Sequence, residues 1–198
     1  NQKLGTQMKA TGEVMSIGRT FEESLLKAIR SLETGVFHLY MEKFDEKTRE
    51  ELLSYIKAGT DDRIFAVAQL LRLGCNVQQI AFETKIDGFL GKMKKIIEME
   101  NMLKANPWNR DVLHEAKRGG FSDRAVAWLW NTDEDTVFRI RKEMHLFPVY
   151  KMIDTCASEF DSYVPYFYST YEEENESIAE DRKKFWCLDQ VLSESVRA

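Results

Sequence analysis

The stretch GFSDRAVAWLWNTDEDTVFRIRKEM, residues 120–144, is the part of this chain most suggestive of binding chemistry. Ser122 can cap a first helix and Asn131 can end it. A second helix then carries three basic side chains, Arg139, Arg141 and Lys142. Two short helices joined by a tight turn, with basic residues on the second, are typical of helix-turn-helix units that bind DNA. A DNA-binding regulator is therefore one hypothesis.

The start of the second helix argues against DNA reading. In a helix-turn-helix this turn enters the major groove, and here it contains three carboxylates, Asp133, Glu134 and Asp135. They oppose the phosphate attraction that supplies non-specific affinity, whereas they suit the positive end of a helix dipole. The sequence favours a packing unit whose basic residues form a solvated or partner-facing edge, available for salt bridges. Its expected core residues are Trp128, Leu129, Val137, Phe138 and Ile140.

The remaining chemistry-bearing residues do not predict an active site. The sequence has no G-x-S-x-G, Walker or dinucleotide-binding pattern. The cysteines and histidines lack metal-ligand spacing, and nothing fixes the separation of carboxylates that could pair. These residues are Cys75, Cys156, Cys187, His38, His114, His145, Glu13, Glu159 and residues 172–174. We expect no catalytic, cofactor-binding or metal-binding residue, and we expect Cys156 to be a small buried hydrophobe.

The composition excludes several classes of protein. The chain has 198 residues, is 43% hydrophobic and 31% charged, and carries a formal charge of -5, so no overall positive field attracts nucleic acid. It shows neither a membrane-spanning run nor a signal-peptide pattern, and its odd number of cysteines fits a reducing compartment. We expect a globular, cytoplasmic protein with no nucleic-acid or membrane partner. The initial Asn suggests a fragment.

The elements that must position these residues are helices. Only three prolines occur and long stretches lack turn residues, which favours an all-α fold. The most regular pattern covers residues 86–103, where apolar residues recur every three or four positions. Gly88 and Gly91 lower the helix propensity of this stretch, and we expect a neighbouring helix to approach closely there.

Caps and apolar stripes predict the other helices. Thr20 with Glu23 fits a capping box for a helix at residues 21–33, and Thr60 opens a helix that ends at Gly74. Further helices are expected at residues 46–58, 76–84 and 109–118, which with the two of residues 120–144 makes about eight. Residues 8–18 and 147–171 lack helical periodicity, and we expect the second to be a partly extended segment over the helices. The acidic run of residues 172–176 is expected to be a solvated exit.

One family resembles this chain over nearly all of residues 4–184. The resemblance rests on four stretches, MKATGEVMSIGRTFEESLLKAIRSLE (8–33), DRIFAVAQLLRLG (62–74), IDGFLGKMKKIIEME (86–100) and HLFPVYKMIDTCASEFDSYVPYFYSTYEEENES (145–177). They are similar to the large subunit of carbamoyl phosphate synthase. GGFSDR (119–124) falls where that family has a similar turn into a helix. Phe147 departs from the His that the family usually has.

The resemblance implies a division of the chain. The family's large subunit has two similar ATP-grasp synthetase halves joined by a helical oligomerisation domain. By resemblance, residues 1–33 end the first, carboxyphosphate-forming half, residues 34–178 form the oligomerisation domain, and residues 179–198 are a linker and an aberrant tail. The parent enzyme is a ligase that uses ATP, Mg or Mn, bicarbonate and ammonia from a glutaminase small subunit. It makes carbamoyl phosphate for arginine and pyrimidine biosynthesis. None of its ATP or metal motifs lies in this chain, so we expect the chain alone to be non-catalytic.

The last residues depart from the family. Past Lys184 the family continues into a strand and a glycine-rich loop, whereas this chain reads FWCLDQVLSESVRA, residues 185–198. Codons for the family peptide LGSGPIRIGQG, read in a shifted frame, encode LDQVLSESVRA, residues 188–198. We hypothesise that the tail is a frame-shifted start of the second half.

The sequence thus predicts an all-α oligomerisation domain of about eight helices, with a short extended segment near its C-terminal end. Its expected partners are the two synthetase halves, the glutaminase small subunit of the parent and a second copy. Apolar residues at 37–41 and 163–171 are expected to support self-association. The alternative is the DNA-binding regulator built on residues 120–144.

Overall fold

The computed structural model describes residues 14–32, 34–154 and 166–177. This part of the chain contains eight α-helices and one two-stranded sheet, which confirms the predicted all-α class and the short extended segment near the C-terminal end. The predictions for Glu13, Cys156, Glu159, Cys187 and the tail of residues 179–198 lie outside the described residues.

The helices follow one another through short connections. They are α1 (Phe21–Ser31), α2 (Arg49–Lys57), α3 (Arg63–Arg72), α4 (Val77–Thr84), α5 (Leu90–Ala105), α6 (Arg110–Arg118), α7 (Asp123–Trp130) and α8 (Glu134–Glu143). A 3-10 turn, η1 (Glu42–Phe44), precedes α2. After α8, β1 (Val149–Met152) pairs antiparallel with β2 (Phe167–Thr170), and Val149 lies opposite Thr170.

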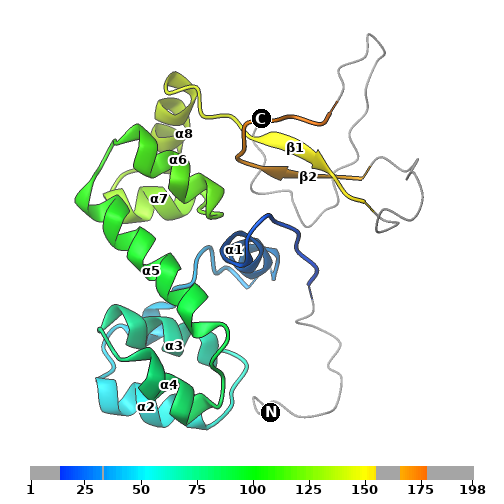
Figure 1. Cartoon of the computed structure of the whole chain (residues 1–198). Coiled ribbons are helices and arrows are strands. Elements are labelled where there is room, and N and C mark those ends of the chain that lie inside the picture. Colours follow the sequence, from blue (N-terminus) through cyan, green and yellow to red (C-terminus); the bar gives the residue numbers. More distant parts are fainter. Residues whose placement is uncertain (1–13, 33, 155–165, 178–198) are drawn as a thin grey trace.

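The helices form two groups joined by α5 (Figure 1). α2, α3 and α4 pack at one end, α6, α7 and α8 at the other, and α5 contacts members of both groups. α1 lies beside α5, and the hairpin lies beyond α1 and α8. One apolar core runs through both groups and includes Leu26, Leu70, Ile96, Leu113 and Val126. The burial of a stripe on each helix therefore holds the domain together.

Local capping signals explain several helix starts. Thr48 and Glu51 form both bonds of a capping box at α2. At α1, Thr20 accepts from the Glu23 amide as predicted, but the Glu23 carboxylate accepts from the amide of Arg19 instead of that of Thr20. The expected start of α3 at Thr60 is wrong, because α3 begins at Arg63 and its N-cap residue makes no side-chain cap bond.

Gly120 is the position where two backbones approach closely. A Cβ built there, at a φ of +89°, would lie 2.7 Å from the Cα of Glu23, so α1 packs against the α6–α7 turn because residue 120 has no side chain. The expected close approach at Gly88 and Gly91 is wrong, since a Cβ at either position meets nothing within 4 Å. Gly88 also lies before α5 begins.

Candidate functional site

A buried carboxylate, Glu100 of α5, lies where the two helix groups meet. It is 1% exposed and accepts hydrogen bonds from Arg72 Nε at 2.9 Å, Arg72 Nη2 at 2.7 Å and His38 Nε2 at 2.8 Å. Arg72 also donates to the Leu39 carbonyl at 2.6 Å. These bonds tie α3 and the segment before η1 to α5.

The protonation states in this cluster follow from its contacts. Burial raises the pKa of Glu100, but the bonds from Arg72 and His38 outweigh it and the pKa is about 2. Burial lowers the pKa of His38. Its Nε2 must donate to the carboxylate, while Nδ1 has no partner among the described residues, so the ring is neutral with its proton on Nε2. Glu100 is thus ionised and forms a buried ion pair with Arg72.

A second, largely buried carboxylate, Asp123, with a side chain 11% exposed, joins α6, α7 and α8. Lys117 Nζ donates to it at 2.8 Å, and Arg141 donates through Nε at 3.1 Å and Nη2 at 3.0 Å. Burial raises the pKa of Asp123, but the two cations outweigh it and lower that pKa. Burial lowers the pKa of Lys117 to about 8. The ring of Tyr171, next to β2, covers the pair at 5.0 Å from Lys117 and 5.7 Å from Arg141.

This geometry corrects part of the prediction for residues 120–144. Arg141 is buried and forms a salt bridge, whereas Arg139 and Lys142 are exposed. Leu129 and Val137 are buried as predicted. The remaining predicted core residues are less buried, because Phe138 and Ile140 are half-buried and Trp128 is 36% exposed. For Arg141 the predicted solvated position is thus wrong, although the predicted salt bridge is confirmed. The predicted core position is wrong for Trp128.

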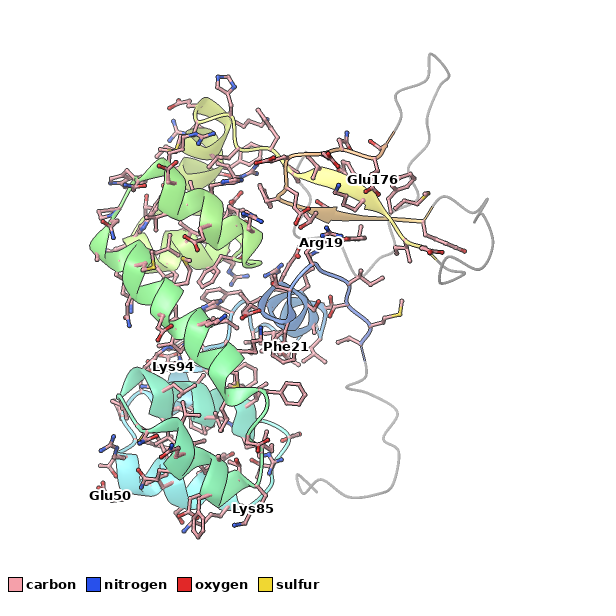
Figure 2. The ribbon with its side chains drawn as sticks, viewed as in Figure 1. Arg19, Phe21, Glu50, Lys85, Lys94 and Glu176 are labelled. Atoms are coloured by element: carbon pink, nitrogen blue, oxygen red, sulfur yellow. The ribbon has the colours of Figure 1, made fainter. Side chains whose placement is uncertain are left out.

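Lys27 of α1 connects the chain before this helix to the hairpin. Its Nζ donates to the carbonyls of Ile17 at 2.9 Å and Ser169 at 2.7 Å, and pairs with Glu23 at 2.8 Å. Arg19 adds an ion pair to Glu172 at 3.3 Å, reaching from the start of α1 toward the hairpin (Figure 2). The predicted extended segment over the helices is therefore confirmed for the described part.

The acidic run after β2 is only partly solvated. Glu174 is exposed, but Glu172 pairs with Arg19. Asn175 accepts from the amide of Tyr150 at 3.1 Å, and Glu176 accepts from the amide of Met152 at 2.7 Å. The run therefore covers the outer edge of β1, while residues 173–176 are exposed as expected and only Glu172 is half-buried.

The contacts of the two charged clusters indicate that they stabilise the fold. Glu100 accepts hydrogen bonds from Arg72 and His38, and Asp123 from Lys117 and Arg141, which leaves neither carboxylate poised as a base or nucleophile. In the described ranges, no group of three His, Cys, Asp or Glu side chains is arranged to hold a metal ion. Across the same ranges no helix is long and apolar enough to cross a membrane.

Sequence reasoning missed Glu100, Arg72, Lys117 and Asp123. One signal was available for Glu100, because it follows Met93, Ile96 and Ile97 at the helical spacing of a buried stripe. A carboxylate at such a position requires a buried cationic partner, but the spacing does not identify which one.

A group of aromatic side chains lies next to His38 of the Glu100 cluster, with the Trp128 ring 6.1 Å from the His38 ring. The ring of Trp128 lies 4.6 Å from that of Tyr40 and 6.0 Å from that of Phe37. Of the predicted apolar surface at residues 37–41, His38 and Leu39 are fully buried, whereas Phe37 and Tyr40 are half-buried. Trp128 therefore extends a surface that the sequence located only in part.

Comparison with known families decides what these helices are. Residues 13–145 match the carbamoyl-phosphate synthetase large chain, oligomerisation domain. The chain belongs to this family. The match includes all of α1 to α8 and ends before the hairpin, so the eight-helix assembly is an oligomerisation domain of the carbamoyl-phosphate synthetase large chain. The domain boundaries near residues 33 and 178 stay predictions.

The DNA-binding alternative gains no support from the family or from the geometry. The supposed recognition helix, α8, exposes Glu134 and Asp135 in its first turn. Arg141 bonds to Asp123 inside the domain and is not available to phosphate.

Proposed function

We propose that this domain spaces and orients the two synthetase halves of a carbamoyl-phosphate synthetase large chain and associates with a second copy of itself. The observation that carries the proposal is the family match across all eight helices. The parent enzyme would supply the chemistry, using ATP, Mg or Mn, bicarbonate and ammonia from a glutaminase small subunit to make carbamoyl phosphate for arginine and pyrimidine biosynthesis. The cytoplasm is its proposed location.

The bonds of α1 support a connector role. The segment before α1 leads toward the proposed first half, and the segment after β2 leads toward the second. Lys27 bonds to the backbone of the first segment at Ile17 and to that of β2 at Ser169, and Arg19 pairs with Glu172 of the segment after β2. A connector that fixes orientation needs such a tie, because unbonded linkers behave as flexible coils.

A replacement in the parent large chain tests this function. Residues 34–177 are replaced by a Gly/Ser linker of equal length, which should preserve reach but lose orientation. We expect carbamoyl phosphate formation and the association of enzyme copies to be lost while both halves stay folded. The matched control carries Lys94→Ala, a change at an exposed position of α5. Full synthesis and unchanged oligomeric mass in the replaced chain would overturn the proposal.

A further inference from the structure

The hairpin lies outside the apolar core of the helices. None of the described residues after Leu146 belongs to that core. Among the residues of β1 and β2, only Lys151 and Thr170 are buried, and both are polar. Shared apolar burial is what makes a segment unfold together with the rest of its domain. The hairpin is therefore attached to the helices in another way.

Tyr171, directly after β2, is attached through its aromatic ring. The centre of the ring lies 5.0 Å from Lys117 Nζ of α6 and 5.7 Å from the guanidinium of Arg141 in α8. Both cations are buried. A cation is attracted to the face of an aromatic ring, and the attraction is stronger where water is excluded. The ring of Tyr171 therefore binds the end of the hairpin to two helices.

Two further cations, Lys27 and Arg19, hold β2 and the residues after it. Lys27 Nζ donates to the Ser169 carbonyl at 2.7 Å and lies 5.5 Å from the centre of the Tyr168 ring. Arg19 pairs with Glu172 at 3.3 Å. In each of these contacts the helices or the segment before α1 supply a cation, and the hairpin side supplies a ring, a carbonyl or a carboxylate. Cation contacts thus take the place of apolar burial at this junction.

Three of the four cations keep a partner on the helices when these contacts are broken. Lys27 also pairs with Glu23 at 2.8 Å. Lys117 and Arg141 pair with Asp123 at 2.8 and 3.0 Å. The fourth cation, in the segment before α1, is exposed to solvent, which can replace its carboxylate partner. Removal of the hairpin therefore opens no apolar core and leaves no buried charge without a counter-ion, which is the change that makes a broken ion pair costly.

The hairpin and the residues after it form one connected unit. β1 pairs with β2, and the Glu176 amide donates to the Tyr150 carbonyl at 2.9 Å. We call residues 149–153 and 166–177 the strap. A two-stranded hairpin without the support of a larger body is only marginally stable in water. We therefore expect the amides of the strap to exchange with solvent once it has left the helices.

We propose that the strap is a separable unit, which undocks from the helices while the helices stay folded, and which is held in the docked state by the cations Arg19, Lys27, Lys117 and Arg141. In the proposed parent enzyme the second synthetase half follows the strap, so docking fixes that half to α1 and undocking frees it. This consequence for the parent rests on the proposed function, whereas the separability of the strap does not.

Hydrogen exchange followed by mass spectrometry on the 198-residue chain measures undocking. The amides of the strap are compared with those of α5 and α7 under native conditions. Exchange through local opening is faster than exchange through global unfolding, and low urea changes it little because little surface becomes exposed. We expect the strap to be protected, but to exchange at least about tenfold faster than α5 at a rate that low urea does not change.

Variants of two strap contacts test what holds the docked state. Tyr171→Leu keeps an apolar side chain but removes the ring face, so we expect strap exchange about tenfold faster. Tyr171→Phe keeps the ring and should behave like the unmodified chain. Arg19→Met removes an exposed ion pair and should speed strap exchange about threefold. Its matched control is Arg139→Met, at an exposed position of α8. Unchanged exchange in α5 and α7 shows that each variant is folded.

Four results would overturn the strap. Exchange of its amides only together with those of α5 shows that it does not open separately. A lack of protection in the unmodified chain shows that it is not docked. Equal strap exchange in Tyr171→Leu, Arg19→Met and the unmodified chain shows that the cations do not hold it. Strap exchange as fast in Tyr171→Phe as in Tyr171→Leu assigns docking to the hydroxyl instead of the ring. If Tyr171→Leu fails to fold, Arg19→Met still decides.

Small-angle X-ray scattering on the parent large chain tests the consequence for the second half. Tyr171→Leu should give a larger radius of gyration than the unmodified large chain, because a half on a flexible connection samples more positions. Tyr171→Phe should leave the radius unchanged. Equal radii in all three, with faster strap exchange in Tyr171→Leu, would overturn the coupling of the strap to the second half. The linker replacement tests the connector role separately from both measurements.

Discussion

His38 is the residue whose environment gives the domain a pH dependence. Its ring is 0% exposed, its Nε2 proton is committed to Glu100, and its Nδ1 has no partner among the described residues. A second proton would therefore place an unbonded N–H donor in the core. Burial keeps the pKa of His38 below its ordinary value of 6.5. The domain is thus built to hold a neutral histidine beside a charged carboxylate.

Acidification should destabilise the domain through His38. Above pH 6.5 the His38 ring is neutral in the folded and in the unfolded chain. Below pH 6.5 the unfolded chain takes up a proton that the folded chain does not, so the free energy of unfolding falls as the pH falls. The slope is at most about 1.4 kcal/mol per pH unit. Glu100 does not lower the stability over the pH range in which His38 titrates. The stability that the ionised Glu100 carboxylate contributes is lost only at lower pH, between its ordinary pKa of 4.5 and about 2. Urea unfolding between pH 7.5 and about 5 measures the effect.

His38→Gln isolates this contribution. The Gln amide can donate to Glu100 but does not titrate, so we expect the pH slope to shrink relative to the unmodified chain. His145→Gln, at an exposed position, is the matched control. An equal slope in His38→Gln and the unmodified chain would show that another group controls the acid response.

Gly120 predicts a second residue-scale effect. Gly120→Ala should cost about 3 kcal/mol, because it adds a strained positive φ and a clash with backbone that cannot move aside. Gly74→Ala is the control, since Gly74 has a φ of +74° but open space around its Cβ, and it should cost about 1 kcal/mol. Urea denaturation of both variants gives the comparison. An equal loss of unfolding free energy in the two variants would mean that the close contact of residue 120 with α1 does not contribute to the stability.

At the scale of elements, Asp123 holds three helices together. Asp123→Ala should cost about 3–5 kcal/mol, because it leaves Lys117 and Arg141 buried without a counter-charge. Asp133→Ala removes an exposed N-cap bond to Thr136 on the neighbouring helix and should cost about 1 kcal/mol. Thermal or urea unfolding distinguishes them. A cost for Asp123→Ala no larger than the cap loss would contradict a structural role for this cluster.

Local signals predicted the elements well, because caps and apolar stripes act over a few residues. All eight helices were predicted, and the largest boundary error is the start of α5, predicted at residue 86 and found at Leu90. The cause is local too, since Lys85 ends α4 in a left-handed conformation and residues 86–89 make the turn. Sequence periodicity alone does not reveal such a reversal.

The buried clusters were not predictable from the sequence because their partners are distant along it. His38 and Glu100 are 62 residues apart, and Arg72 and Glu100 are 28 apart. The same holds for Trp128, whose exposure depends on its position over Phe37 and Tyr40. The frame-shift hypothesis for residues 185–198 stays a prediction, which the reading frame of the encoding DNA tests.

At the scale of the whole molecule, the two helix groups are joined by the long helix α5. The segment before α1 and the segment after β2 lie on the same side of this assembly (Figure 1). α1 packs against α5, and the hairpin lies on the same side of α5 but farther out, beyond α1 (Figure 1). The ion pair between Arg19 and Glu172 and the bonds of Lys27 join these segments directly.

The whole-molecule charge predicts that this chain does not bind duplex DNA. The formal charge is -5, and the helix that would enter the major groove begins with exposed Glu134 and Asp135. Burial of Arg141 leaves only Arg139 and Lys142 of the predicted basic edge at the surface. Two cations behind two carboxylates supply no net attraction to phosphate. Fluorescence polarisation with a labelled duplex at low salt should therefore show no salt-dependent binding.

A variant shows whether that assay is sensitive enough. Glu134→Lys with Asp135→Lys turns the first turn of α8 basic while leaving the Asp133 cap in place. We expect it to gain weak duplex binding that disappears as salt rises, because its affinity would come from displaced counterions. Binding by the unmodified chain with a steep salt slope would restore the DNA-binding hypothesis. A gain only in the variant would locate the barrier to DNA binding in the acidic turn of α8.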